Sequence, residues 1–463
     1  MNNSIVQLKI EQVNQPESSA VKKPENLVAV PRNRFLISNN EQTVMWLSPR
    51  SMVPEDHIVW FINEAVNRLD LRAFVAGSGG TDARGRHSYD PVMLVKLIVY
   101  CRATGRHSSR QIEKAAQEDI PCRLLTSGQQ PHHDTIANFE NVNREALANL
   151  YTQSLNLATQ ADLIELDIVA VDGSKIKASA SRHKAMSFGR MKTRIGELRK
   201  EIKKIKKSLK KRSLAASQKR KLNADLEFKT SRVNTIIENK QELENRVAAE
   251  FASKQEIVKS KQRSNKPESK TQINFTDRES RIMRKGKGFE QAYNAQVVVD
   301  KRAQIIVAQS VTQEGNDKLQ LVPMSQQVKI NMGRSPNRVL GDTGYSSEEA
   351  LSAPELADID LFVPPVREKN YKALPPMVGR IPADISQSDR MKRKLRTTAG
   401  RAMYAIRKGL VEPVFGQIKR CMRFSEFTVR GLVKAQQEWS FMCALHNLLK
   451  ICRHEQKVAR IQT

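Results

Sequence analysis

Residues 168–172 read Ile-Val-Ala-Val-Asp, a short apolar run that ends in an acid. Such a run is typical of a buried strand, which would deliver the carboxylate of Asp172 at its tip. Residues 339–342 read Val-Leu-Gly-Asp and repeat the pattern, so they would deliver Asp342 in the same way. We therefore predict two strands whose aspartates are held rigidly against one site.

The segments around these two runs predict the rest of a sheet. Residues 291–299 alternate and then run apolar, and residues 305–308 follow after a turn, which is typical of adjacent antiparallel strands. A helix is predicted from Asp317 to Val328, another after the Ser346-Ser347 cap, and a last strand at 361–363. Strands that alternate with helices indicate an α/β domain with a mixed sheet, which we place at residues 161–450.

Residues 189–262 interrupt this pattern with a heptad rhythm. Apolar residues recur in steps of four and three at Met191, Ile195, Leu198, Ile202, Ile205 and Leu209. After a polar break near residues 213–217 the rhythm resumes at Leu222, Leu226, Val233, Ile236, Leu243 and Val247. We predict an inserted antiparallel coiled-coil hairpin. Its dense basic residues either contact DNA phosphates or form an ordinary solvated face.

Residues 45–160 read as a domain of short helices. An apolar stripe from Ile58 to Val66 predicts the first helix, and a glycine-rich loop at 77–85 follows it. Asp90-Pro91, Ser108 and His133-Asp134 each mark a helix start, and Pro121 follows the end of the helix that Ser108 caps. Short helices joined by turns are typical of helix-turn-helix DNA binders, although a packing or dimerisation domain has the same pattern.

The net charge of the chain indicates the kind of partner that it binds. The 463 residues include 78 Lys and Arg against 49 Asp and Glu, a surplus of +29 that favours a polyanion such as DNA. The chain has no apolar stretch of about 18 residues, which disfavours a membrane-spanning role. Residues 1–44 are polar, without the apolar core of a signal peptide, and predict a flexible arm, while residues 451–463 form a basic tail. We expect a cytoplasmic protein associated with the bacterial nucleoid.

The cysteines do not indicate a disulfide framework. They are five in number and contain no C-x-x-C pair. Cys443, His446, Cys452 and His454 suggest a zinc site by proximity, but the apolar residues between them form a helical stripe. We therefore interpret this segment as core.

Three carboxylates could form a metal-dependent nuclease or strand-transfer site. Mg²⁺ requires hard oxygen ligands, which Asp172 and Asp342 would supply from strands and Glu412 from a helix. Asp277, Asp300 and Asp317 are other carboxylates, and a lone acid beside a strand is usually a turn former or a cap.

Three blocks of sequence resemble the catalytic blocks of DDE-type transposases of bacterial insertion sequences. They are residues 171–177 (Val-Asp-Gly-Ser-Lys-Ile-Lys), 341–345 (Gly-Asp-Thr-Gly-Tyr) and 411–419 (Val-Glu-Pro-Val-Phe-Gly-Gln-Ile-Lys). Residues 288–296 and the helical stretch 89–147 are similar to the same family. The resemblance implies an RNase H-like catalytic domain, with Asp172, Asp342 and Glu412 as the metal-binding acids for two Mg²⁺ ions, or Mn²⁺ as a substitute.

The resemblance also implies partners and an activity. The partners would be the inverted-repeat ends of the element and a target DNA, bound by a homodimer or larger assembly, and the reactions would be strand cleavage and strand transfer. An RNase H-like nuclease or resolvase that cuts without joining is one alternative. A non-catalytic DNA-binding coiled-coil protein is another, which the three intact acids disfavour.

One basic motif departs from the family pattern. These enzymes often have Tyr, two residues, Arg, three residues, Glu, six residues and Lys, whereas Tyr404, Arg407, Glu412 and Lys419 are separated by two, four and six. Lys408 rather than Arg407 stands at the expected distance from Glu412, so the sequence does not decide which of the two holds the basic position. We expect Tyr404, Arg407 and Lys419, together with Lys175, Lys177 and Arg420, to contact DNA. Since proline is costly inside a helix, Pro413 predicts a helix that begins there, with Glu412 in its first turn.

Overall fold

The computed structural model describes residues 50–76, 88–210, 215–255, 265–286, 288–365, 375, 377, 379–382 and 384–462. The predicted arm at residues 1–44 and the loop with Gly77, Gly79, Gly80 and Gly85 lie outside the described residues. None of the described helices is long and apolar enough to cross a membrane.

The first part of the described chain is helical, as predicted. Its elements are α1 (Ile58–Asn67), α2 (Arg72–Ala76), α3 (Pro91–Ala103), α4 (Ser109–Glu118), α5 (Ile120–Leu125), α6 (His133–Val142) and α7 (Arg144–Gln160). Asp90 caps α3 by accepting hydrogen bonds from the backbone of Val92 and Met93. Ser108 and Gln111 form a reciprocal capping box at α4. The predicted helix starts at these positions are therefore confirmed.

A six-stranded sheet follows. Its strands are β1 (Ile168–Lys177), β4 (Arg281–Lys285), β5 (Gly288–Asp300), β6 (Ile306–Thr312), β7 (Arg338–Leu340) and β8 (Asp360–Phe362). The order is β4-β5-β1-β7-β8, and β6 also pairs with β5. Strand β5 is antiparallel to β1, β4 and β6, whereas β7 is parallel to β1 and β8. The prediction of an α/β domain with a mixed sheet is confirmed.

Two elements differ from their predicted bounds. Strand β1 does not end at Asp172 but continues to Lys177, because its polar second half pairs residue by residue with β5. The helix expected from Asp317 is α10 (Leu321–Met332). A start at Asp317 would place Pro323 in the helix interior, whereas the observed start leaves it in the first turn, where proline needs no hydrogen-bond partner.

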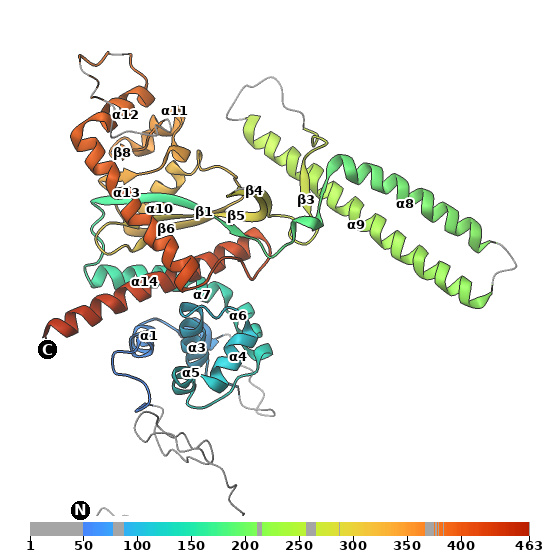
Figure 1. Cartoon of the computed structure of the whole chain (residues 1–463), viewed down its shortest axis with the longest axis horizontal. Coiled ribbons are helices and arrows are strands. Elements are labelled where there is room, and N and C mark those ends of the chain that lie inside the picture. The colour runs from blue at the N-terminus through green and yellow to red at the C-terminus, as the bar shows by residue number, and fades with distance from the viewer. Residues whose placement is uncertain are drawn as a thin grey trace, which may run out of the picture. The chain divides into compact units, whose positions relative to one another are not determined.

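Between β1 and β5 the chain forms a separate helical pair. Helices α8 (Phe188–Leu209) and α9 (Ala216–Gln255) lie side by side, as Figure 1 shows. Glu201 bonds to Lys229, and the Phe188 ring lies under the ammonium of Lys240, so the helices run in opposite directions. At their base, β2 (Ala185–Ser187) pairs with β3 (Gln272–Asn274).

The helical pair has its own apolar cluster. It consists of Phe188, Met191, Ile195, Leu198, Val233, Ile236, Leu243 and Ile273. Seven of the twelve predicted seam positions are buried. The other five are half-buried: Ile202, Leu209, Leu222, Leu226 and Val247. This cluster is separate from the main core, so the pair stabilises itself.

The last helix, α14 (Leu432–Gln462), joins the first helices to the sheet. A single apolar core includes residues of α3, α7, the sheet and α14. Trp439 is fully buried and donates to the backbone carbonyl of Gln296 on β5. Cys443 and Cys452 are also fully buried, and His446 bonds to the backbone oxygen of Gln304. The interpretation of this segment as core is confirmed.

Candidate functional site

The strand register brings two of the predicted acids together. Strands β1 and β7 are parallel, with Ala170 opposite Leu340. Asp172 follows Ala170 by two residues, and Asp342 follows Leu340 by two residues, so both acids lie at the same end of the strand pair. Asp172 accepts a hydrogen bond from the Gly173 backbone at 2.8 Å, and Asp342 accepts one from the Gly344 backbone at 2.7 Å. The backbone therefore holds both carboxylates.

The charges of these acids interact with one another and with a nearby guanidinium. Burial raises the pKa of Asp172 to about 6, and the negative charges of Asp342 and Asp317 add to this rise, while Arg407 opposes it. The Arg407 guanidinium lies 3.4 Å from Asp172 Oδ2. Half-buried carboxylates that repel one another are stabilised by a cation, and their hard oxygens match the ligands that Mg²⁺ requires.

The structure adds Asp317 to this group. Asp317 Oδ1 accepts hydrogen bonds from Asn294 Nδ2 and Gln296 Nε2, both at 2.7 Å, and from Lys175 Nζ at 3.4 Å. A Cβ atom at Gly173 would lie 2.9 Å from Asp317 Oδ1, so the backbone beside Asp172 passes directly against this acid.

Sequence alone does not distinguish Asp317 from Asp277 and Asp300, because no apolar strand leads directly into it. The residues that indicate a role for Asp317 lie on β5. Asn294 and Gln296 are fully buried amides within the mostly apolar stretch of β5 from Ala292 to Val299. Buried amides require polar partners, and Asp317 is their shared partner.

Helix α13 (Thr398–Gly416) carries the third predicted acid. The side chain of Glu412 is exposed, between the buried side chains of Val411 and Val414. The predicted helix start at Pro413 is wrong, because Pro413 lies inside α13. Proline removes the donor that would serve the Gly409 carbonyl, and Gln304 Nε2 replaces it at 3.0 Å.

The predicted DNA contacts divide into two groups. Arg407, Lys175 and Lys419 face the site: the first two contact Asp172 and Asp317, and Lys419 bonds to the Ser174 hydroxyl. Lys177 instead pairs with Glu426 at 2.7 Å.

Two further predicted DNA contacts come from the same helical region. Arg420 is exposed in the π-helical turn η4 (Gln417–Cys421) that follows α13. Burial raises the pKa of Tyr404, whose ring lies beside the Arg407 guanidinium. Helix α13 and the turn η4 therefore present Arg407 toward the carboxylates and Arg420 toward solvent.

Comparison with protein families gives two matches. Residues 47–142 match a transposase domain, DUF772, and residues 378–452 match a transposase DDE domain. Comparisons with characterised proteins and with solved structures gave no match. Both matched segments are therefore transposase domains, and the second indicates a family of enzymes that act on DNA.

The chain thus contains two transposase domains, which supports its resemblance to the DDE transposases of insertion sequences. The first match covers α1 to α6, and the second covers α13 and the turn η4, with Arg407, Glu412 and Lys419. Asp172 and Asp342 lie outside both matched segments, so their assignment rests on the strand geometry.

Proposed function

We propose that the chain binds the ends of an insertion sequence and catalyses Mg²⁺-dependent cleavage and strand transfer of DNA. The observation that supports this most directly is the register that brings Asp172 and Asp342 together on neighbouring parallel strands. Glu412, on the nearby helix α13, is the third acid of the proposal. We also propose that the sheet is RNase H-like, which is consistent with the first acid lying on a central strand flanked by β5 and β7.

The three acids would hold two Mg²⁺ ions, with Mn²⁺ as a substitute. When bound, the ions supply activation of the attacking oxygen and stabilisation of the leaving oxygen. Asp172 and Asp342 fit this role because their backbone hydrogen bonds fix them before an ion arrives. Glu412 is exposed, so its longer side chain is free to turn toward the site.

The chain's cations have a separate role in the proposal. Arg407 neutralises Asp172 until an ion replaces it, and its guanidinium is then free to bind a phosphate. Lys419 is held at Ser174, two residues from Asp172 along β1, where it would orient the DNA backbone. Arg420, which is exposed, would extend these contacts.

The two helical regions would bind DNA away from the chemistry. We propose that residues 45–160 recognise the element's ends and that residues 189–262 add phosphate contacts. Replacing residues 189–262 by a Gly/Ser bridge tests the second part. Each lost phosphate contact should flatten the log–log salt dependence of binding by about 0.9. An unchanged slope would show that the helical pair does not contact phosphates.

The activity is tested by incubating the chain with linear DNA that carries the element's ends, plus a plasmid target and Mg²⁺. We expect cuts at the ends and joined products, and neither in EDTA. Cuts without joining under conditions that assemble both ends would favour the nuclease alternative. Specific binding without any cut would favour a non-catalytic DNA-binding protein.

A further inference from the structure

Asp317 has an uneven set of contacts. Three side-chain donors, from Lys175, Asn294 and Gln296, all reach its Oδ1 atom. Its other oxygen, Oδ2, lies 3.5 Å from the place where a Cβ of Gly344 would be, which is beside the loop that holds Asp342. One oxygen therefore anchors the side chain, and the other faces the aspartate site.

The surrounding amides are oriented to donate hydrogen bonds to Asp317. Asn294 is fully buried and donates to Oδ1, although this orientation leaves its own Oδ1 without a hydrogen-bond partner among the described residues. Gln296 donates to Asp317 with its nitrogen and accepts from the buried Tyr345 hydroxyl with its oxygen. Donors of this kind stabilise an ionised carboxylate.

From this geometry we infer that Asp317 is a fourth carboxylate of the metal site and binds an ion through Oδ2. The inference rests on the proposed function, since it assumes that Asp172 and Asp342 bind divalent ions. Asp317 is thereby distinguished from Asp300, whose oxygens accept backbone hydrogen bonds from Leu166 and Arg302.

The replacement Asp317→Asn separates metal binding from structural support. An asparagine oxygen can still accept from the three donors, but the second oxygen is lost. We expect the affinity for Mn²⁺, measured by calorimetry on the full chain, to fall at least tenfold with an unchanged melting temperature. Asp317→Glu, which keeps two oxygens, should recover part of the affinity. Asp358→Asn removes an exposed carboxylate and is the control that should leave affinity unchanged.

The outcomes distinguish the inference from the function on which it rests. If Asp342→Asn weakens Mn²⁺ binding and Asp317→Asn does not, Asp317 is only a structural acceptor and the inference is overturned. If neither change affects Mn²⁺ binding, the proposed metal site itself is wrong. If Asp317→Asn lowers the melting temperature, Asp317→Glu decides the matter, because restored stability without restored Mn²⁺ affinity also overturns the inference.

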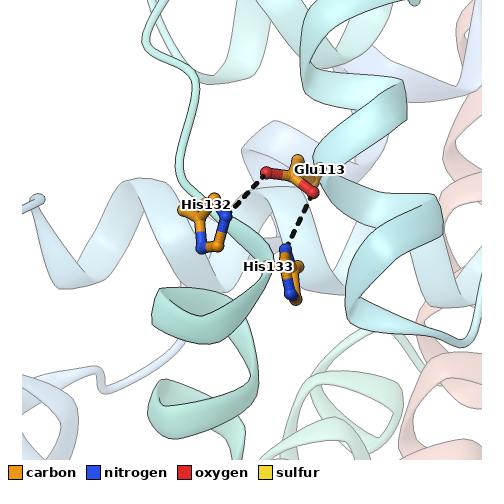
Figure 2. A group of neighbouring side chains, drawn as sticks. All are labelled: Glu113, His132 and His133. Atoms are coloured by element: carbon orange, nitrogen blue, oxygen red, sulfur yellow. Dashed lines mark hydrogen bonds and ion pairs between the residues drawn. The ribbon is translucent and has the colours of Figure 1, made fainter.

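A second and independent group of ligands lies between α4 and α6. Figure 2 shows Glu113 facing the imidazoles of His132 and His133. Glu113 Oε1 lies 3.7 Å from His132 Nε2, and Oε2 lies 3.1 Å from His133 Nδ1. One ligand atom from each of the three residues lies within 4.8 Å of the other two, so they could converge on one ion.

Asp134 occupies the other side of both rings. Its carboxylate lies 3.5 Å from His132 Nδ1 and 3.4 Å from His133 Nε2, the nitrogens that do not face Glu113. Metal-bound histidines typically donate their second N–H to a carboxylate in this way. His132 Nδ1 also accepts the backbone N–H of Asp134 at 3.4 Å, a helix cap that metal binding would exchange for the carboxylate contact.

We propose that Glu113, His132 and His133 bind one Zn²⁺ ion, with Asp134 orienting the two rings. Two imidazoles and one carboxylate suit Zn²⁺ and leave a fourth position for water, since His133 and Glu113 are about one-fifth exposed. The N-terminus of α6 disfavours a cation, whereas the negative charges of Glu113 and Asp134 beside the two rings favour one. The ion would tie α4 to α6 within the segment that matches the DUF772 transposase domain.

Calorimetry of the untagged full chain with Zn²⁺, in excess Mg²⁺, tests this proposal. We expect one tight Zn²⁺ per chain, lost in His133→Ala and in Glu113→Gln but retained in the exposed-histidine control His183→Ala. Co²⁺ should give the strong visible absorption of a tetrahedral site in the wild type alone. Equal Zn²⁺ stoichiometry and affinity in wild type, His133→Ala and Glu113→Gln would overturn the site, as would no Zn²⁺ binding by the wild type.

Discussion

The sheet and the helix α13 contribute to the candidate site in different ways. On the sheet side, Asp172 and Asp342 are held by backbone hydrogen bonds, and strand register determines their separation. On the helix side, Glu412 is exposed, and Arg407 is instead the residue that contacts a site carboxylate. In the proposed site the sheet would therefore provide preorganised ligands, whereas the helix would provide positive charge and one acid whose side chain can change position.

The largest expected effect comes from the sheet side. Asp172→Ala and Asp342→Ala should each reduce cleavage by at least about a thousandfold, or about 4 kcal/mol of transition-state stabilisation. Binding to the element's ends should stay within about twofold, because affinity comes mainly from phosphate contacts. Gel assays of cutting and of binding on the same DNA measure both. Full cleavage by either variant would remove that residue from the site.

Glu412→Ala should have nearly as large an effect on cleavage but little effect on folding. Because the side chain is exposed, the free energy of unfolding should change by no more than about 0.5 kcal/mol. Denaturant titration measures the stability, and the cleavage assay measures the loss of activity. Normal cleavage by this variant would mean that Asp172 and Asp342 suffice for catalysis. Helix α13 would then support the site without supplying a catalytic acid.

Arg407→Ala should have an intermediate effect. We expect cleavage to fall about tenfold, since a phosphate contact is lost, which is about 1.4 kcal/mol. The affinity for Mn²⁺ should rise, because the guanidinium no longer competes for Asp172. Lys408→Ala, one position along the helix, is the matched control. A parallel fall of Mn²⁺ affinity and cleavage would show that Arg407 positions Asp172 for the ion instead of competing with it.

The smallest effect concerns the irregularity inside α13. In the wild type Gln304→Ala should reduce stability by about 1 kcal/mol, since the Gly409 carbonyl loses its donor. In a Pro413→Ala background the helix supplies its own donor, so the same change should cost less. A double-mutant cycle in thermal melts measures this coupling. Additive effects would show that Gln304 does not compensate for the proline.

Local patterns predicted much of this fold. The caps at Asp90 and Ser108, the apolar runs of β1 and β7, and the heptad positions of α8 act within a few residues, so they are visible in the sequence. The full length of β1 was not visible, because its polar half is held by pairing with β5. Proline inside α13 was also missed, since its compensation comes from Gln304, far away in the chain.

The residues of the candidate site also differ in whether a local pattern or a distant contact identifies them. Asp172 and Asp342 follow apolar runs, so each could be selected locally. Asp317 could not, because its position depends on the buried amides of Asn294 and Gln296 on another strand. Lys175 was expected to contact DNA but turns toward Asp317, an ion pair that only the folded sheet creates.

Arg102, on α3, is buried between Glu140 of α6 and Glu438 of α14, at 2.7 and 3.4 Å. One guanidinium thus pairs with a carboxylate from the DUF772 segment and one from the DDE segment. Its loss would leave the buried Glu438 and the half-buried Glu140 without this ion pair. This has a consequence for how such genes change. A recombination event that exchanged the first helices for those of another element would have to bring a compatible α14 with them. The gene segments that encode α3, α6 and α14 are therefore expected to be inherited together.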